Sequence, residues 1–334
     1  MPGPPAVIDP SASVRNEPVV LSIVIPFYNE ASVLPLLVRE LKRLFSAHAL
    51  EAANIRSVNY LFVDDGSDDD SAALLAAEMT CNHWEGSLLK LSRNFGHQAA
   101  LAAGIDHADG DVVAILDADL QDDPAEIFPM LADWRKGFDV VYGVRNNRKE
   151  HLVKRSAYKV FYSLLHFLSE GLIPKHSGDF GLVDRKVVLA VRAMGEKIRF
   201  FRGLRAWVGF SQKEHVYDRS VRAGGVPKYT YRKLYRLATD GIISASIRPL
   251  KIAEVVSIVS LLIAAATAAV VTYKILTLSQ PAETIMMGYI ILLTVSLLGC
   301  SILACLYVMS AYVGRMFVEV KGRPPYIIAT RLDS

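Results

Sequence analysis

The 334-residue chain has few cysteines and little net charge. Its three cysteines, Cys81, Cys300 and Cys305, form neither a disulfide framework nor a C-x-x-C metal pattern. We therefore expect a reducing compartment for the polar part of the chain. A net charge of +3 is too small to argue for nucleic acid as a partner. Residues 1–18 are rich in proline, alanine and serine and lack the apolar core of a signal peptide, which predicts a flexible tail.

A G-x-G-x-x-G turn is also missing after the first predicted strand, residues 19–25, so a dinucleotide-binding dehydrogenase is poorly supported. Strands and helices alternate instead. The further expected strands are 60–63, 88–91, 112–116 and 140–142, and the expected helices are 32–50, 71–79 and 98–108. This alternation predicts an α/β fold with a mostly parallel sheet covered on both faces. In such sheets, ligands bind beyond the carboxyl ends of the strands.

Charge is nearly absent from two long runs near the C-terminus. Residues 252–276 carry only Glu254 and Lys274, and residues 284–313 carry no charge. Each run exceeds the about 20 residues that cross a hydrocarbon core of ~30 Å, and the short link 277–283 makes them a transmembrane hairpin. Two buried helices of a soluble core are the alternative, which the length and apolarity of the second run disfavour.

Basic residues flank the hairpin and are missing from its link. This bias predicts two spans in the inner (cytoplasmic) membrane, with the large domain and both termini in the cytoplasm. The flanking basic residues are Arg248, Lys251, Arg315, Lys321, Arg323 and Arg331. The predicted organisation is a tail (1–18), an α/β domain (19–228), a juxtamembrane amphipathic helix (229–247), the hairpin (248–313) and a C-terminal tail (314–334).

Two carboxylates and an amide follow the strand at 112–116. On an extended segment, side chains two residues apart point the same way, so Asp117, Asp119 and Gln121 can converge on one Mg²⁺ or Mn²⁺. An acidic turn with a helix cap at Asp123 is an equally good interpretation of these residues alone. A calcium loop is excluded, because its glycine position falls on Asp122 and its closing glutamate position on Phe128.

Four motifs in order carry a resemblance: Ile25-Pro-Phe-Tyr-Asn-Glu30, Asp64-Asp-Gly-Ser67, Ser92-Arg-Asn-Phe-Gly-His-Gln98 and Asp117-Ala-Asp-Leu-Gln121. Together they resemble the family 2 glycosyltransferases. More narrowly, residues 21–320 are similar to the polyprenyl-phosphate glycosyltransferases, relatives of dolichol-phosphate mannose synthase. The resemblance implies a GT-A catalytic domain that uses Mg²⁺ or Mn²⁺, and a homo-oligomer, with a tetramer favoured.

The resemblance also implies roles for individual residues. Those expected to bind the nucleotide sugar are Pro26, Tyr28, Glu30, Asp65, Asn94, Asp117, Arg222 and Lys228. Those expected to bind the acceptor phosphate are Arg145, Arg155 and Arg205, of which Arg155 opens an amphipathic segment running to about residue 168. Asp117, Asp119 and Gln121 would hold the metal, and Asp179 and Asp119 would be catalytic. Relatives commonly carry serine at Pro227 and arginine at Gly181, so local contacts there differ.

The implied reaction is an inverting, metal-dependent transfer of a sugar from a nucleotide-diphosphate sugar to polyprenyl phosphate at the cytoplasmic face. A UDP-sugar is the favoured donor. The product would serve envelope glycosylation or lipopolysaccharide modification. A lipid monophosphate has its second pKa near ~6 and is mostly ionised at neutral pH, so Asp179 is expected to orient the acceptor or stabilise an oxocarbenium-like sugar. The alternatives are another lipid or polysaccharide acceptor, a catalytically silent scaffold of the same fold and, remotely, a channel-like assembly.

Overall fold

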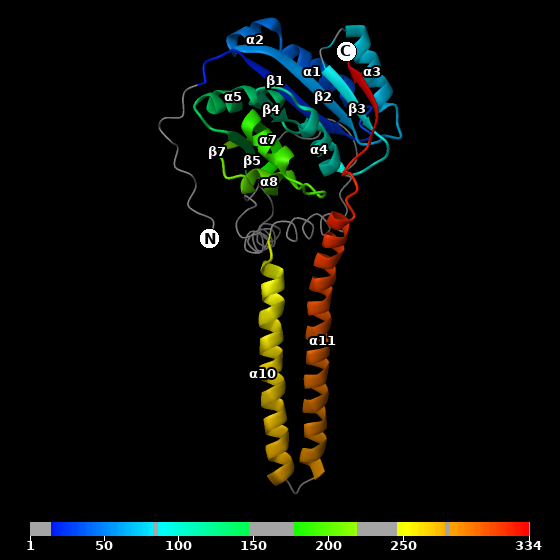
Figure 1. The fold of residues 1–334 in the computed structure, drawn as a ribbon, viewed down its shortest axis with the longest axis vertical. Helices are drawn as coiled ribbons and strands as arrows, with labels where there is room; N and C mark the ends of the chain where they lie inside the picture. Colours follow the sequence, from blue (N-terminus) through cyan, green and yellow to red (C-terminus); the bar gives the residue numbers. More distant parts are fainter. Residues whose placement is uncertain are drawn as a thin grey trace.

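The computed structural model describes residues 15–82, 84, 86–146, 177–218, 246–277 and 281–333. These residues form an α/β domain that stands at one end of two long helices (Figure 1). The amphipathic segment predicted from Arg155 to about residue 168 lies outside the described residues, as do Arg222 and Lys228. The predicted juxtamembrane helix 229–247 also lies outside them, except for its last two residues.

One sheet of eight strands organises the domain, in the order β7-β5-β6-β4-β1-β2-β3-β8. The strands are β1 (Val19–Phe27), β2 (Ile55–Asp64), β3 (Gly86–Leu91), β4 (Val112–Ile115), β5 (Val140–Arg145), β6 (Ser177–Asp184), β7 (Gln212–Tyr217) and β8 (Ile328–Asp333). The central strands β4, β1, β2 and β3 are parallel, whereas β6 and β8 run antiparallel to their neighbours. The predicted fold class, a mostly parallel α/β sheet followed by two long apolar helices, is confirmed.

Helices cover both faces of this sheet. They are α1 (Leu34–Leu44), α2 (Ala47–Ala52), α3 (Ser71–Asn82), α4 (His97–His107), η1 (Pro124–Glu126), α5 (Ile127–Arg135), α7 (Arg185–Ala193) and α8 (Phe201–Trp207). Alternate residues of β1 serve two apolar cores: Ile23 and Ile25 pack in one, and Val24 packs in the other. Gly104 lets α4 approach β1 closely, because a Cβ there would lie 2.2 Å from Val24.

The single helix expected over 32–50 is two helices. The break falls at Ser46, whose backbone is extended (φ −66°, ψ 157°) before α2 begins. Helical spacing of apolar residues continues across that point, so the pattern alone gave no sign of the break.

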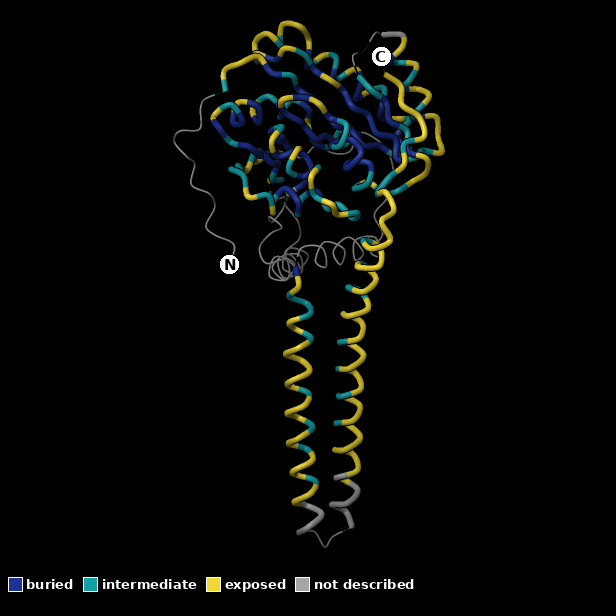
Figure 2. Tube along the Cα trace, viewed as in Figure 1, coloured by how far each residue is buried: buried dark blue, intermediate teal, exposed yellow. Residues whose placement is uncertain are grey.

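The two long helices are α10 (Arg248–Thr277) and α11 (Pro281–Val320). Their apolar stretches are long enough to cross a membrane and are 0% and 6% buried, so they are not core helices of the domain (Figure 2). Forty residues of α11 span about 60 Å, roughly twice a hydrocarbon core. The helix runs to Val320, beyond the boundary expected at residue 313.

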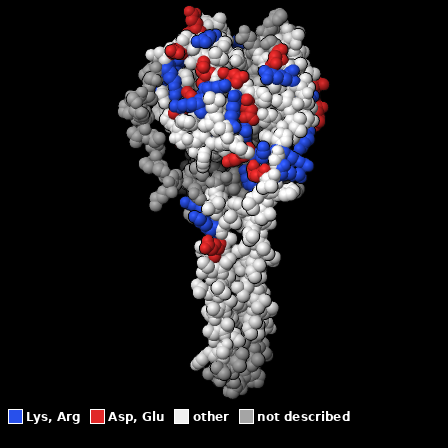
Figure 3. All heavy atoms as spheres, viewed as in Figure 1, with Lys and Arg blue, Asp and Glu red and all other residues white. Residues whose placement is uncertain are grey.

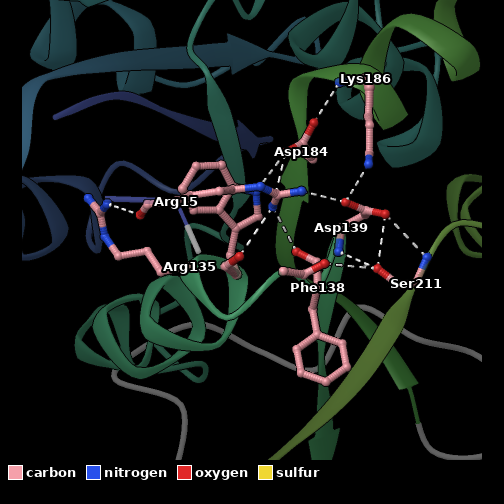
Figure 4. Close-up of polar contacts among 9 residues, drawn as sticks. Arg15, Arg135, Phe138, Asp139, Asp184, Lys186 and Ser211 are labelled. Atoms are coloured by element: carbon pink, nitrogen blue, oxygen red, sulfur yellow. Dashed lines mark hydrogen bonds and ion pairs between the residues drawn. The ribbon is translucent and has the colours of Figure 1, made fainter. Parts of the chain in front are cut away.

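At each end of the described chain, residues that were expected to belong to a tail contact the domain. After α11 the chain returns to the domain, and β8 pairs with β3, so the expectation of a C-terminal tail over 314–334 is wrong for residues 328–333 (Figure 1). The reason is that β3 would otherwise leave an unpaired edge. At the other end, Arg15 lies in the predicted tail, yet its guanidinium stacks on Trp134 and bonds Asp139 at 2.6 Å (Figure 4).

Candidate active site

The loops after β1 and β2 are tied together at the carboxyl edge of the sheet. The N–H of Asn29, which has a positive φ of 52°, donates to Ser67 Oγ at 3.0 Å, and the Asn29 side chain accepts from Asp68 N–H at 2.9 Å. Tyr28 donates its hydroxyl to Asp68 at 3.1 Å, and the backbone of buried Glu30 donates to Ser71. These contacts bring together the predicted nucleotide residues of the two loops, Pro26, Tyr28, Glu30 and Asp65.

Asp65 joins this edge to the loop after β3. Its carboxylate accepts from the N–H groups of Phe95 and Gly96 at 2.8 and 3.0 Å. Burial raises the pKa of Asp65, and these two backbone bonds oppose the rise. The sequence assigned Asp65 to the base of the nucleotide; the structure gives it a loop-ordering contact as well. Asn94, in that loop, is exposed.

Asp117 and Asp179 meet because β4 and β6 are antiparallel. Ile115 pairs with Gly181, and continuing this register by two residues brings Asp117 opposite Asp179. Nε2 of His97, the first residue of α4, lies 3.7 Å from Asp117 Oδ1 and 3.5 Å from Asp179 Oδ2. Burial would lower the pKa of His97, but the bond to Asp179 and the charges of both carboxylates raise it to about 9.

Asp179 is the most heavily partnered carboxylate at this edge, and it is only 3% exposed. Arg202 of α8 binds both of its oxygens, at 2.9 and 3.0 Å, and Gln98 donates to Oδ2 at 3.1 Å. Burial would raise the pKa of Asp179, but Arg202 and His97 outweigh burial and hold that pKa well below its usual range. Asp179 is therefore a buried, ionised carboxylate.

Three of these partners were not predicted to be functional: His97, Gln98 and Arg202. The first two end the motif Ser92–Gln98, which carried the resemblance without a role for either residue. Arg202 lies in segment 200–210, which is rich in aromatic residues and arginine. The signal that was present in the sequence is the pair of arginines at positions 202 and 205, three residues apart on one helix face.

The segment after β4 does not continue as a strand, so the argument from alternating side chains is wrong beyond Leu116. Residues 118–120 form a turn with a positive φ of 53° at Leu120, and Asp119 Oδ1 accepts from the N–H of Gln121 at 3.2 Å. Asp123 also caps η1 by accepting from Ala125 N–H. The acidic turn and the helix cap are therefore both present.

These residues nevertheless fit a divalent cation. Burial raises the pKa of Asp117, His97 opposes the rise, and the nearby carboxylates of Asp179, Asp122 and Asp119 add to it, so Asp117 lies where several acidic side chains gather. Within the described part of the chain, no group of three His, Cys, Asp or Glu side chains is arranged to hold a metal by itself. Mg²⁺ and similar ions are commonly held by one or two carboxylates together with substrate phosphates.

Arg145 is engaged within the domain. Its Nη2 lies 3.7 Å from Asp122 Oδ2, and the other oxygen of Asp122 accepts from the Tyr217 hydroxyl at 2.6 Å. Asp122 directly follows Gln121 and is fully buried. The three side chains therefore anchor the acidic turn to β5 and β7, a role that differs from the predicted contact of Arg145 with an acceptor phosphate.

Arg205 is 1% exposed, and its guanidinium lies 4.6 Å from the centre of the Tyr142 ring. Burial lowers its pKa to about 10, and the charge of Asp179 opposes that change. Among the described residues, nothing accepts a hydrogen bond from its Nε or Nη2. A buried donor left unpaired costs about 1–3 kcal/mol.

Comparison with known proteins gives the family. Residues 22–191 match glycosyl transferase family 2. The chain is 40% identical over 313 residues to an uncharacterized glycosyltransferase of Synechocystis sp., covering 92% of this chain and 94% of that protein. It is 32% identical over 311 residues to the SfII prophage-derived bactoprenol glucosyl transferase of Shigella flexneri, covering 92% and 97%.

Solved structures resemble it more loosely. A mannosyltransferase from Pyrobaculum calidifontis in complex with GDP-Man and Mn²⁺ is 17% identical, with a TM-score of 0.42 over 91% of this chain and 88% of that one. Glucosyl-3-phosphoglycerate synthase from Mycobacterium tuberculosis, in complex with Mn²⁺, UDP and phosphoglyceric acid, is 16% identical, with a TM-score of 0.45 over 67% and 75%. On the sequence matches, the chain belongs to glycosyl transferase family 2.

Proposed function

We propose that this protein is a membrane-bound, inverting glycosyltransferase that moves a sugar from a UDP-sugar to polyprenyl phosphate at the cytoplasmic face. The observation that carries the proposal is the buried, ionised Asp179, held by Arg202 and Gln98 opposite Asp117 at the carboxyl edge of the sheet. The bactoprenol glucosyl transferases among its relatives support a polyprenyl-phosphate acceptor.

The donor occupies the edge formed by the loops after β1, β2 and β3. Tyr28 and Asp65 lie there, and the contacts among Asn29, Ser67 and Asp68 hold the loops before a ligand arrives. Such preorganisation lowers the entropy that donor binding would otherwise lose. The diphosphate lies toward Asp117 and Asp119.

Asp117, Asp119 and Gln121 would hold Mg²⁺ or Mn²⁺ against that diphosphate. When bound, the ion would neutralise the negative charge that develops on the departing nucleoside diphosphate. The structures of two more distant glycosyltransferases in complex with Mn²⁺ support a divalent ion of this kind.

Asp179 is unsuited to be a general base, because its ion pair with Arg202 makes the carboxylate a weak proton acceptor. The reaction needs little proton abstraction, since the acceptor phosphate is mostly ionised at neutral pH. A phosphate oxygen attacks the anomeric carbon, and the bond from that carbon to the diphosphate breaks on the opposite face. Asp179 then stabilises the positive charge of the oxocarbenium-like sugar between them.

The acceptor phosphate is assigned to the cationic side of Asp179, where Arg205 supplies the unpaired donors Nε and Nη2. An arginine pairs well with a phosphate through two parallel hydrogen bonds. A buried guanidinium with unpaired donors pays a desolvation cost that an apolar side chain of similar volume does not pay. Arg205→Met is therefore expected to keep or raise the melting temperature while raising the KM for the acceptor.

The test of the function is a panel of nucleotide sugars with the purified full-length protein. Thermal stabilisation in the presence of Mn²⁺ identifies the donor, and mass spectrometry of the lipid fraction identifies the product after incubation with polyprenyl phosphate. Diacylglycerol and a polysaccharide serve as competing acceptors. Transfer to either in place of polyprenyl phosphate, or no transfer with any donor, would contradict the proposal.

A further inference from the structure

The end of α11 contacts the rest of the protein through one helix face. Tyr312, Arg315 and Glu319 are spaced three and four residues apart, so their side chains share that face. The Tyr312 hydroxyl donates to the carbonyl of Ser246 at 2.6 Å, two residues before α10 begins. Arg315 Nη2 donates to the carbonyl of Ile198 at 3.0 Å, in the α/β domain. Figure 3 shows charged side chains at this junction above an uncharged shaft.

Glu319 holds the backbone that leads into α8. One carboxylate oxygen accepts from Lys197 N–H at 2.9 Å, and the other accepts from Ile198 N–H at 3.3 Å. Both amides lie between α7 and α8, where the chain has no regular structure to pair them. Hydrogen bonds to an ionised acceptor are roughly twice as strong as neutral ones, so Glu319 is a firm attachment for this segment.

The attached segment ends at the partners of Asp179. Phe201 N–H donates to Gln98 Oε1 at 3.0 Å, and the amide of the same Gln98 donates to Asp179. Arg202, four residues beyond Ile198, binds both oxygens of Asp179. A short, continuous path of contacts therefore joins the last turn of α11 to Asp179.

A second attachment limits how this segment moves. Arg199 Nη1 binds Asp106 Oδ1 at 2.5 Å, and the Tyr326 hydroxyl donates to Asp106 Oδ2 at 2.9 Å. Asp106 belongs to α4, the helix that also begins with His97 and Gln98. The segment before α8 and the segment after α11 are thus fixed to the same carboxylate.

We propose that Glu319 is a positioning residue for sugar transfer, which sets Arg202 and Asp179 at a defined place relative to the hairpin. This inference rests on the proposed function. An acceptor whose lipid tail stays in the bilayer presents its phosphate near the membrane surface, so the carboxylate beside it needs a fixed height above the hairpin. Glu319 supplies that fixed relation, because it is part of α11 and bonds the entry to α8 directly.

The test compares Glu319→Ala with Glu254→Ala in the full chain in nanodiscs. Glu254 is an exposed carboxylate near the start of α10, so its removal is the control for loss of one negative charge at the hairpin. Hydrogen exchange is measured first, because it needs no substrate. Glu319→Ala is expected to speed exchange over residues 197–204, and the control is not. Unchanged exchange in Glu319→Ala would overturn the proposal.

Kinetics then separate positioning from simple loss of stability. Displacements of about 1 Å can cost up to about 10²-fold in rate, so Glu319→Ala is expected to lower kcat about tenfold with the donor KM unchanged. Glu319→Gln keeps one acceptor oxygen, so its kcat is expected to lie between the kcat of the unaltered protein and that of Glu319→Ala. In the double variant of Glu319→Ala and Arg202→Lys, the fold-loss in kcat is expected to be less than the product of the two single fold-losses, because both changes act on Asp179.

These experiments distinguish a failure of the inference about Glu319 from a failure of the proposed function. If the fold-losses of Glu319→Ala and Arg202→Lys multiply fully, Glu319 acts independently of Arg202 and the inference is wrong. If the unaltered protein transfers no sugar, the proposed function fails, and with it the positioning role of Glu319 in transfer. Faster exchange over 197–204 in Glu319→Ala would in that case still show that Glu319 orders the entry to α8.

Discussion

The α/β domain buries charge, whereas the helical hairpin leaves apolar side chains exposed. In the domain, Asp65, Asp122, Asp179 and Arg205 are each at most 3% exposed. In the hairpin, large apolar side chains are exposed, Leu293 by 71%, and the shaft carries no charge along most of its length (Figures 2 and 3). A soluble protein usually exposes its charged side chains and buries its large apolar ones. The domain departs from this rule by burying charge, and the hairpin departs from it by exposing apolar side chains.

The two departures have different physical explanations. A buried charge is tolerated when partners compensate it, and at Asp179 those partners are Arg202, His97 and Gln98. An exposed apolar surface is tolerated when the surroundings are themselves apolar, as in a bilayer. We propose that the domain performs the chemistry at one edge of its sheet and that the hairpin holds the protein in the bilayer. The contacts of Glu319 join the two regions.

The largest effect is expected at the buried charge. Asp179→Asn keeps the shape of the side chain but removes the charge opposite Arg202, so we expect transfer to fall on the order of 10³-fold with nucleotide affinity retained. Radiolabelled transfer and calorimetric titration of the nucleotide measure the two quantities. Asp109→Asn, at a carboxylate whose side chain is 74% exposed, is the control. Unchanged turnover in Asp179→Asn would remove Asp179 from the mechanism.

The exposed apolar surface is tested with a matched pair of leucines. Leu297 of α11 and Leu189 of α7 are 49% and 50% exposed, yet only the first is predicted to face lipid. Leu297→Arg is expected to make membrane insertion less favourable by about 3–4 kcal/mol, whereas the side chain of Leu189→Arg stays in water and costs little. The membrane-integrated fraction after alkaline extraction measures the difference. Equal integration of both variants would contradict the bilayer explanation for the hairpin.

These regions also differ in how far the sequence predicted them. The hairpin was predictable because a long uncharged run is a local signal. The sheet was predictable because alternating apolar segments of strand and helix length are local as well. The strand β8 was not, since its pairing with β3 joins residues more than two hundred positions apart, as the bond between Ser87 and Asp333 illustrates.

The site was predicted in part for the same reason. Asp117 and Asp179 were proposed from the family resemblance, but their meeting depends on the antiparallel register of β4 and β6. Two partners of Asp179 are distant in the sequence: Gln98 of α4 is 81 positions away, and Arg202 of α8 is 23 positions away. A local sequence pattern does not predict contacts over such separations. At Leu120 a positive φ turns the chain, and that turn defeated the argument from alternating side chains.

A smaller effect is expected at Asp139, where Lys186, Arg15 and Ser211 meet one buried carboxylate (Figure 4). Asp139→Asn is expected to cost about 2 kcal/mol at pH 7, the usual range for hydrogen bonds to a charged group. Chemical unfolding of the full chain measures it. Asp109→Asn is again the control and is expected to change stability by less than about 0.5 kcal/mol.

The pH dependence of that difference follows from the pKa of Asp139. Burial would raise this pKa, but Lys186, Arg15 and Ser211 outweigh burial and lower it. Its stabilisation is therefore fully present above the ordinary value of about 3.9 and is lost as the pH falls through the folded value. The difference in the free energy of unfolding between the unaltered protein and Asp139→Asn should be constant from pH 7 to about pH 5, and it should disappear below about pH 4. A gap that closes near pH 6 would point to a different group.

The smallest effect is expected inside the hairpin, where the Thr294 hydroxyl donates to Thr267 Oγ1 at 3.4 Å. Each threonine also bonds a carbonyl of its own helix, Thr294 to Ile290 and Thr267 to Ile263. Since both hydroxyls keep these partners when the helices separate, the double-mutant coupling of Thr267→Val and Thr294→Val should be about 0.6 kcal/mol. Unfolding in mixed micelles measures it. A coupling above about 2 kcal/mol would mean that polar contacts, rather than close apolar packing, hold α10 against α11. The domain and the hairpin would then both depend on polar contacts, and the contrast between them would be weaker.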